Sequence, residues 1–227
     1  MRFDVITIFP EQIKDFIQHG IYRIATSSDK AQIHVHDLRD WTDDRHRTVD
    51  DRPYGGGAGM VLKVEPVYKA LKDIRQDDGI VILPTPRGKK LDQPLVRDLF
   101  GMTEQSVNQM IFLCGHYEGF DERIHQHLVD MEISIGDYVL SGGELPALAI
   151  LDSILRLIPG VLGNDESALD ESFEDGQLEY PQYTRPEEFE GWKVPEVLLS
   201  GDHKKIREWK ETRSAEETKL KRPDLIK

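Results

Sequence analysis

Three apolar segments of this sequence each run directly into a loop that is rich in glycine or proline. The loops are residues 83–88 (LPTPRG), 114–123 (CGHYEGFDER) and 134–146 (SIGDYVLSGGELP). Strand-like segments that alternate with helix-like segments predict an α/β domain with a largely parallel sheet. Ligands of open parallel sheets bind at the carboxyl ends of the strands. Each loop alone could be an ordinary turn, but together they predict one binding site.

The rest of the first 162 residues fits the same alternation. Residues 3–9 and 32–36 read as strands, and Pro10 begins a helical pattern with apolar residues on one side. Helices are expected at 65–75, near 93–100, and after residue 144. This alternation predicts that the α/β domain spans residues 1–162.

The composition changes after this domain. Residues 164–190 carry ten acidic residues and one arginine, which predicts an interdomain linker over 163–190. Residues 191–227 read as a second, helical domain, with two short amphipathic helices around Ile206, Trp209 and Leu220.

Charge and cysteine content limit the class of partner and the compartment. A net charge of −13 argues against indiscriminate binding to nucleic acid, although residues 201–227 hold nine Lys/Arg against six acids. The single cysteine, Cys114, excludes an internal disulfide framework and fits a reducing cytoplasm. No secretory signal is recognisable, and polar residues interrupt the longest apolar run, so no membrane association is expected.

Common cofactor motifs are missing from the sequence. No G-x-G-x-x-G follows the first expected strand, and GGGAG at 55–59 lacks the Lys-Ser/Thr of a phosphate-binding loop. The pairs His34/His36 and His125/His127 have no further ligand at metal-site spacing, so the metal ligands stay unknown. A standard dinucleotide-binding or P-loop enzyme is therefore not expected.

Several segments, in order, match one family. They closely resemble the bacterial tRNA (guanine-N1)-methyltransferases of the TrmD family, which belong to the SPOUT class. The matching segments are RPYGGGAGM (52–60), LPTPRGKKLDQ (83–93), CGHYEGFDER (114–123), SIGDYVLSGGELPA (134–147), DSILRLIPGVLG (152–163), ESFEDGQLEYPQYTRP (171–186) and KRPDL (221–225).

The resemblance implies a fold and a reaction. The fold has helices on both faces of the sheet and a deep trefoil knot, an exception to the rule that chains do not thread loops. A small helical C-terminal domain binds tRNA, and the active site lies between the subunits of a homodimer. The reaction transfers a methyl group from S-adenosylmethionine (AdoMet) to N1 of the guanosine immediately 3′ of the anticodon, which preserves the reading frame. A divalent ion, usually Mg²⁺, is expected to assist.

The resemblance also assigns residues to AdoMet binding. They come from the three loops and are Leu83, Pro84, Thr85, Pro86, Gly115, Tyr117, Glu118, Gly119, Ser134, Ile135, Gly136, Tyr138, Leu140, Gly142, Gly143 and Pro146.

The chemistry needs few further side chains, because AdoMet is already activated and positioning supplies much of the rate. Guanine N1 must lose a proton, which calls for a carboxylate base, and the resemblance places that base at Glu171. Negative charge then grows on O6, and the matching cation is Arg156. Asp170 is the alternative base, and Glu118 is a second possible contributor.

Two positions depart from the family pattern. Glu171 stands where aspartate is usual, and the matching residues on both sides favour it over Asp170. Gln182 stands where many members have histidine, which leaves this position a hydrogen-bonding role only. The resemblance further implies tRNA phosphate contacts for Lys204, Lys205, Arg207, Lys210 and Arg213.

Other functions are weighed against this one. A knotted methyltransferase acting on ribose 2′-OH or another RNA base is not expected to carry the segment at 171–186. A catalytically silent RNA-binding module would not need Arg156 together with a carboxylate at position 171. A nucleotide hydrolase would need a phosphate-binding loop, which this sequence lacks. AdoMet binding would separate the methyltransferases from the other two classes.

Overall fold

The computed structural model describes residues 1–162, 172–173 and 176–226 of the chain. The chain divides into two compact units, Met1–Gly163 and Asn164–Lys227, each of which is described by itself. Asp170 and Glu171 lie outside the described residues.

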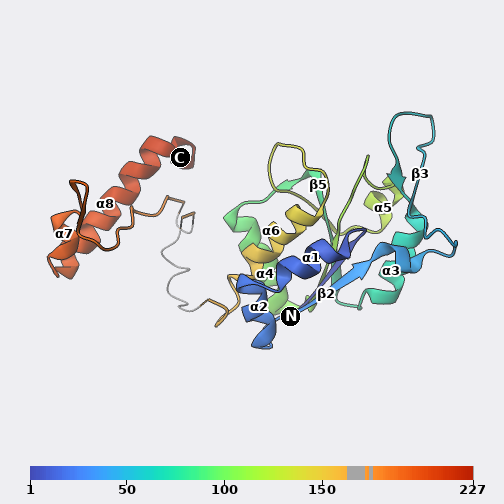
Figure 1. Ribbon diagram of the computed structural model, residues 1–227, viewed down its shortest axis with the longest axis horizontal. Coiled ribbons are helices and arrows are strands. Elements are labelled where there is room, and N and C mark those ends of the chain that lie inside the picture. The colour runs from blue at the N-terminus through green and yellow to red at the C-terminus, as the bar shows by residue number, and fades with distance from the viewer. Residues whose placement is uncertain (163–171, 174–175, 227) are drawn as a thin grey trace. The chain divides into compact units, whose positions relative to one another are not determined.

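The first unit is built on a five-stranded sheet in which every neighbouring pair is parallel (Figure 1). In spatial order its strands are β2 (Gln32–Asp37), β1 (Arg2–Thr7), β6 (Gln109–Leu113), β5 (Gly79–Lys90) and β7 (Met131–Ser134). The prediction of an α/β domain with a largely parallel sheet is confirmed.

Helices cover both faces of this sheet. One face packs against α1 (Pro10–Ile17), α2 (Gly20–Ser27), α4 (Gln93–Gln105) and α6 (Glu144–Leu155). The other packs against the short helix η1 (Leu38–Trp41), α3 (Val64–Ile74) and α5 (Glu122–His127). A two-stranded antiparallel hairpin, β3 (Asp50–Asp51) with β4 (Val61–Leu62), stands apart from the sheet.

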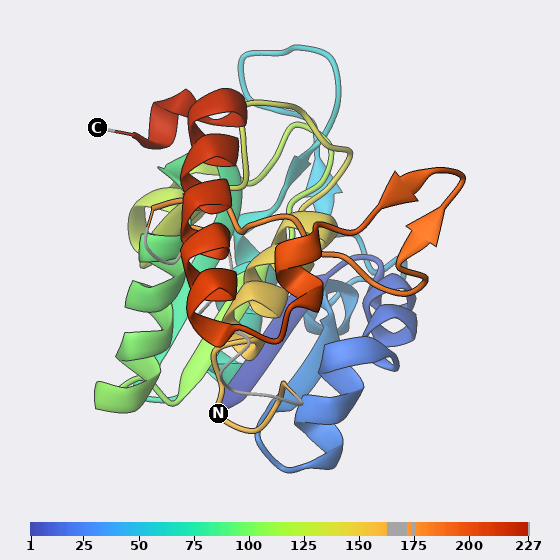
Figure 2. The same cartoon turned by 90° about the vertical axis from the view of Figure 1, so that its left-hand side faces the viewer.

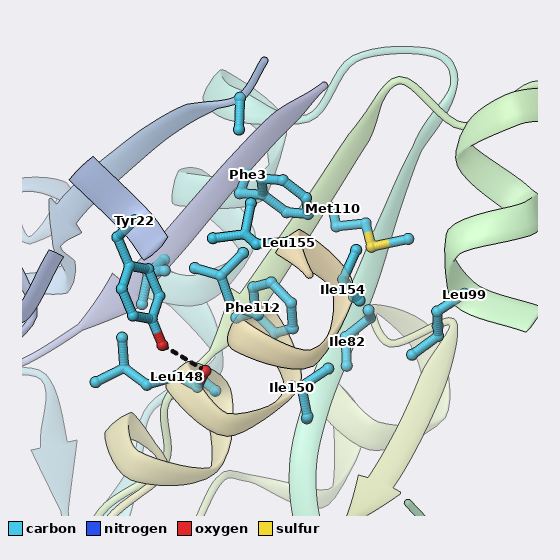
Figure 3. Packing of buried hydrophobic residues seen from close by; sticks show 14 of the residues in the cluster. Phe3, Tyr22, Ile82, Leu99, Met110, Phe112, Leu148, Ile150, Ile154 and Leu155 are labelled. Atoms are coloured by element: carbon cyan, nitrogen blue, oxygen red, sulfur yellow. Dashed lines mark hydrogen bonds between the residues drawn. The ribbon is translucent and has the colours of Figure 1, made fainter. Parts of the chain in front are cut away.

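Successive residues of the central strands point to opposite cores. Met110 and Phe112 of β6 belong to the cluster under α6, while Ile111 and Leu113 belong to the cluster under α3. Both faces are therefore buried, which is why these strands read as continuous apolar runs. Figure 3 shows the first cluster, where the Tyr22 hydroxyl donates to the carbonyl of Leu148 at 2.9 Å.

The helical pattern that begins at Pro10 forms two helices rather than one. The chain turns after α1, and α2 begins at Gly20, whose φ of +56° is a conformation that favours glycine. The apolar spacing on both sides of this turn is continuous, so periodicity alone did not reveal the break.

Within its described residues, 172–173 and 176–226, the second unit contains a hairpin and three helical segments (Figure 2). The elements are β8 (Glu188–Phe189), β9 (Trp192–Lys193), α7 (Glu196–Leu199), α8 (His203–Lys221) and η3 (Pro223–Leu225). The prediction of two short helices around Ile206, Trp209 and Leu220 is wrong, because all three residues lie in α8. No glycine or proline interrupts this helix.

Candidate functional site

The three predicted loops surround one cavity of about 440 Å³ at the carboxyl ends of β5, β6 and β7. Every residue that the resemblance assigns to AdoMet binding lines it. The cavity lies wholly within the first unit. Its position is the one at which open parallel sheets bind ligands.

Further residues line the cavity that the resemblance did not select. Six of them lie inside the predicted loops, so their position in those loops could have indicated them: Arg87, His116, Phe120, Glu122, Val139 and Ser141. The other two, His125 and Ile133, lie outside these loops. The guanidinium of Arg87 donates to Glu122 at 3.0 Å, and this hydrogen bond raises the pKa of Arg87.

The wall formed by β5 is a bulge rather than the simple loop that was expected after this strand. Pro84 and Lys89 both pair with Ile133 of β7, so residues 85–88 loop out between two paired positions. Gly88 makes this possible: a Cβ there would lie 2.3 Å from the backbone nitrogen of Ile133. The bulge thereby brings Thr85 and Pro86 to the cavity.

The loop after β6 is held by backbone hydrogen bonds to the β3–β4 region. The amide of Glu118 donates to the carbonyl of Met60 at 3.0 Å, and the amide of Leu62 donates to Gly119 at 2.9 Å. Tyr117 adopts a positive φ of 59°, which is uncommon for a residue with a Cβ. The Glu118 side chain packs where a Cβ on Gly59 would stand.

The glycine pair of the third loop is required by close backbone packing. The amide of Gly143 donates to the carbonyl of Gly115 at 2.8 Å. A Cβ on Gly143 would lie 2.7 Å from the Cα of Cys114, so no larger residue fits. Burial, with the nearby charge of Glu144, raises the pKa of the Cys114 thiol, which favours the predicted role as a small packing residue.

Arg156 is not brought to the cavity of its own chain. It caps the carboxyl end of α6, whereas the amino end of that helix lies at the cavity. Arg156 is ten positions after Pro146, and a rise of 1.5 Å per residue places them about 15 Å apart. Of the other candidates, Glu118 lines the cavity, while Asp170 and Glu171 lie outside the described residues.

Preformed metal sites and membrane-crossing helices are not found in the described part of the chain. No group of three or more His, Cys, Asp or Glu residues there is arranged to hold a metal ion. No helix in the same ranges is both long enough and apolar enough to cross a bilayer. His125 instead contacts Glu132 at 2.5 Å, and His36 contacts Asp4 at 2.7 Å.

Several of the basic residues expected to contact tRNA already have partners within the second unit. Lys210 donates to the Tyr180 hydroxyl at 2.6 Å and lies 4.2 Å from the centre of that ring. Arg213 pairs with Glu216 and lies over the ring of Trp209.

The fold and the cavity define an α/β protein with a ligand site at the carboxyl edge of its sheet, and comparison with known proteins gives the family. The family profile described as "tRNA (Guanine-1)-methyltransferase TrmD" matches residues 1–227. The chain belongs to this family, whose members are AdoMet-dependent enzymes that methylate N1 of guanosine in tRNA.

Relatives from several bacteria are similar over the full length of the chain. A tRNA (guanine-N(1)-)-methyltransferase of Methylacidiphilum infernorum is 52% identical over 227 residues, 99% of this chain and 96% of that protein. The enzyme of the same name from Staphylococcus carnosus is 51% identical over 227 residues, 100% of this chain and 91% of that protein. The enzyme of the same name from Bacteroides thetaiotaomicron is 47% identical over 228 residues, 100% of this chain and 99% of that protein.

Proposed function

We propose that the cavity at the carboxyl edge of the sheet binds AdoMet, and that the methylated guanosine is the one immediately 3′ of the tRNA anticodon. One observation carries the proposal: the residues assigned by resemblance, from segments far apart in the sequence, surround a single cavity. Its volume falls within the range of roughly 300–1,000 Å³ typical of small-molecule sites. Ile135 and Leu140 offer apolar contacts suited to the adenine.

The side chains proposed for catalysis are few. AdoMet supplies an activated methyl group when bound. Glu171 accepts the N1 proton of guanine, so that the nitrogen lone pair is free to form the new N–CH₃ bond. Arg156 stabilises the negative charge that develops on O6. Asp170 is the alternative base, and Glu118 is a candidate for contact with the guanine.

The proposal includes a homodimer in which each active site draws on both subunits. The separation of about 15 Å along α6 between Pro146 and Arg156 supports it, since an arginine side chain does not span that distance. Isologous dimers are the commonest symmetric assembly, and one interface of this kind creates two equivalent sites. The deep trefoil knot and the role of residues 191–227 as a tRNA-binding domain belong to the same proposal.

The cytoplasm is the proposed compartment, because the tRNA substrate is found there and Cys114 is a free, buried thiol. A need for a divalent ion, with Mg²⁺ as the expected one, is also proposed. The described residues provide no preformed cluster for it, so no step is assigned to an ion.

Methyl transfer to two tRNA transcripts tests the proposed function. The transcripts differ only in carrying guanosine or adenosine 3′ of the anticodon, and labelled AdoMet is the donor. We expect label on the guanosine transcript alone, lost in Glu171→Gln and retained in Asp170→Asn. Chelation by EDTA should stop transfer, and added Mg²⁺ should restore it. Label on both transcripts would place the methylated base elsewhere.

A further inference from the structure

A buried carboxylate lies behind the wall of the cavity. Glu144 is the first residue of α6, and its exposed fraction is only 5%. Its Oε1 accepts a hydrogen bond from the Thr7 hydroxyl at 2.5 Å, and its Oε2 lies 2.7 Å from Nε2 of His116. Burying a carboxylate is costly unless it is paired and hydrogen-bonded, and here both oxygens have partners.

The three residues come from three separate elements. Thr7 ends β1, His116 lies in the loop after β6, and Glu144 begins α6. The imidazole of His116 also packs against the Phe9 ring in an edge-to-face arrangement, with the two ring centres 4.7 Å apart. The Phe9 amide in turn donates to the Thr7 hydroxyl at 2.9 Å. The carboxylate therefore joins three segments that are far apart in the sequence.

The pair formed by His116 and Glu144 also fixes the third loop. His116 and Gly142 both line the cavity and form an isolated antiparallel bridge. A Cβ on Gly142 would lie 2.2 Å from Nε2 of His116 and 2.5 Å from Oε2 of Glu144. Beside this contact, the amide of Gly143 donates to Gly115. The loops that contribute most of the cavity wall are thus joined edge to edge.

The favourable position of an acid in the first turn of a helix does not explain this arrangement. A carboxylate exposed to solvent there would interact with the helix dipole just as well, at no cost of burial. Burial of Glu144 against His116 is better explained by a requirement to hold the two loops in one geometry. A site whose loops are already ordered loses less entropy on binding its ligand.

We propose that Glu144 and His116 are positioning residues, which hold the loops at 115–119 and 136–143 in the conformation that binds AdoMet. The pair thereby sets the affinity for the methyl donor. This inference rests on the proposed placement of AdoMet in the cavity. Neither residue is required to contact the transferred methyl group.

Calorimetric titration of the full chain with AdoMet, without tRNA, tests the inference. Glu144→Gln keeps the size of the side chain and an acceptor for Thr7 but removes the charge that faces His116. We expect AdoMet to bind about tenfold more weakly, the effect of losing one charged hydrogen bond. At saturating AdoMet, kcat should stay within about twofold of wild type, because the chemical step is unchanged.

A second readout uses the free protein. Amide hydrogen exchange in residues 136–143 should be faster in Glu144→Gln than in wild type, since local opening becomes easier. A double-mutant cycle with His116→Asn should show that the two substitutions are not additive. Asp130→Asn is the matched control: Asp130 accepts from Arg75 and from the amide of Val81, at the amino-terminal edge of the sheet. Its AdoMet affinity should equal that of wild type.

The outcomes separate this inference from the proposed function. If Glu144→Gln kept the AdoMet affinity and the hydrogen-exchange rates of wild type, the positioning role would be wrong. The same would hold if Asp130→Asn lost as much AdoMet affinity as Glu144→Gln. In both cases AdoMet binding in the cavity would still stand. A wild-type protein that bound no AdoMet would instead overturn the proposed placement of the ligand, and this inference with it. Should Glu144→Gln fail to fold, Thr7→Val removes the other hydrogen bond to Glu144 and must weaken AdoMet binding.

Discussion

Asp4 is a fully buried carboxylate in the middle of β1, and its partners come from distant parts of the chain. Arg2 donates to both of its oxygens, Gln109 donates at 2.8 Å, and His36 contacts it at 2.7 Å. Burial by itself would raise the pKa of Asp4. The hydrogen bonds from His36, Arg2 and Gln109, with the charge of Arg2, outweigh burial and lower this pKa from 3.8 to about 2.

The lowered pKa predicts how stability depends on pH. The contribution of Asp4 is fully present above pH 3.8 and is lost as the pH falls towards 2, and the shift is worth about 2 kcal/mol. Asp4→Asn should lower the free energy of unfolding at pH 7 by about 2–4 kcal/mol, because Arg2 loses its buried partner. The difference in unfolding free energy between wild type and Asp4→Asn should be smaller at pH 2.5 than at pH 7, as measured by urea unfolding at both pH values.

Asp44→Asn is the control for this experiment. Asp44 is an exposed carboxylate that accepts a hydrogen bond from the hydroxyl of Thr48. The substitution should change the stability much less than Asp4→Asn at either pH. If Asp4→Asn lost the same unfolding free energy at pH 7 and at pH 2.5, the carboxylate of Asp4 would not be the titrating group.

Contacts of this kind mark the limit of what the sequence could predict at single residues. The sequence correctly predicted a strand in residues 3–9, where β1 spans Arg2–Thr7. It did not indicate that Asp4 and Thr7 would be buried, since their partners lie as far away as Gln109 and Glu144. Periodicity describes which face a residue occupies, and only the folded chain determines what covers that face.

Among the elements, α8 presents one stripe of side chains to the segment that precedes it. The Thr218 hydroxyl accepts from the Leu178 amide at 2.8 Å, and the Ser214 hydroxyl donates to the Leu178 carbonyl at 2.6 Å. Lys210 bonds to Tyr180 one turn earlier. Positions four residues apart share a helix face, so this stripe is occupied by the protein's own chain.

This arrangement predicts different roles for two basic residues of α8. Within the described ranges, the side chain of Arg207 has no hydrogen-bond or ion-pair partner, whereas Lys210 is engaged with Tyr180. Arg207→Ala should lower the slope of log Kd for tRNA against log salt concentration by about 1, the signature of one lost phosphate contact. Lys210→Met should leave that slope unchanged. Filter binding across a series of KCl concentrations measures both.

Equal loss of slope in the two variants would contradict the assignment and indicate that Lys210 leaves Tyr180 to contact phosphate. Circular dichroism is the accompanying control, because Lys210→Met removes a packing contact within the second unit. The family resemblance assigned these residues as one group to tRNA phosphate contacts. It could not separate them, because the distinction depends on which face of α8 the chain covers.

The bulge in β5 is a second element whose form the sequence did not predict. Two prolines within residues 83–88 argued for a loop after the strand, since proline interrupts a sheet. Pairing with β7 nevertheless resumes at Lys89, opposite the same Ile133 that pairs with Pro84. The location of the cavity was predictable from where the strands end, but the return of the chain to the sheet was not.

At the scale of the whole molecule, the central question is whether one chain contains a complete active site. The cavity lies at the amino end of α6 and Arg156 at its carboxyl end. A straight helix between them leaves no route for Arg156 to reach a ligand in the same cavity. The proposed dimer resolves this if the partner subunit supplies its own Arg156.

Mixed dimers of two inactive variants test this arrangement. Arg156→Ala removes the cation, and Gly142→Val should disrupt the cavity, because any Cβ there would overlap His116. Each variant alone should be inactive. When equal amounts are unfolded, mixed and refolded together, half of the dimers carry one chain of each kind, and one of their two sites is intact if the cavity and Arg156 come from different chains. Methyl transfer should then recover to about a quarter of the wild-type rate. No recovery, with mixed dimers shown to form by native mass spectrometry, would mean that both elements of each site belong to the same chain.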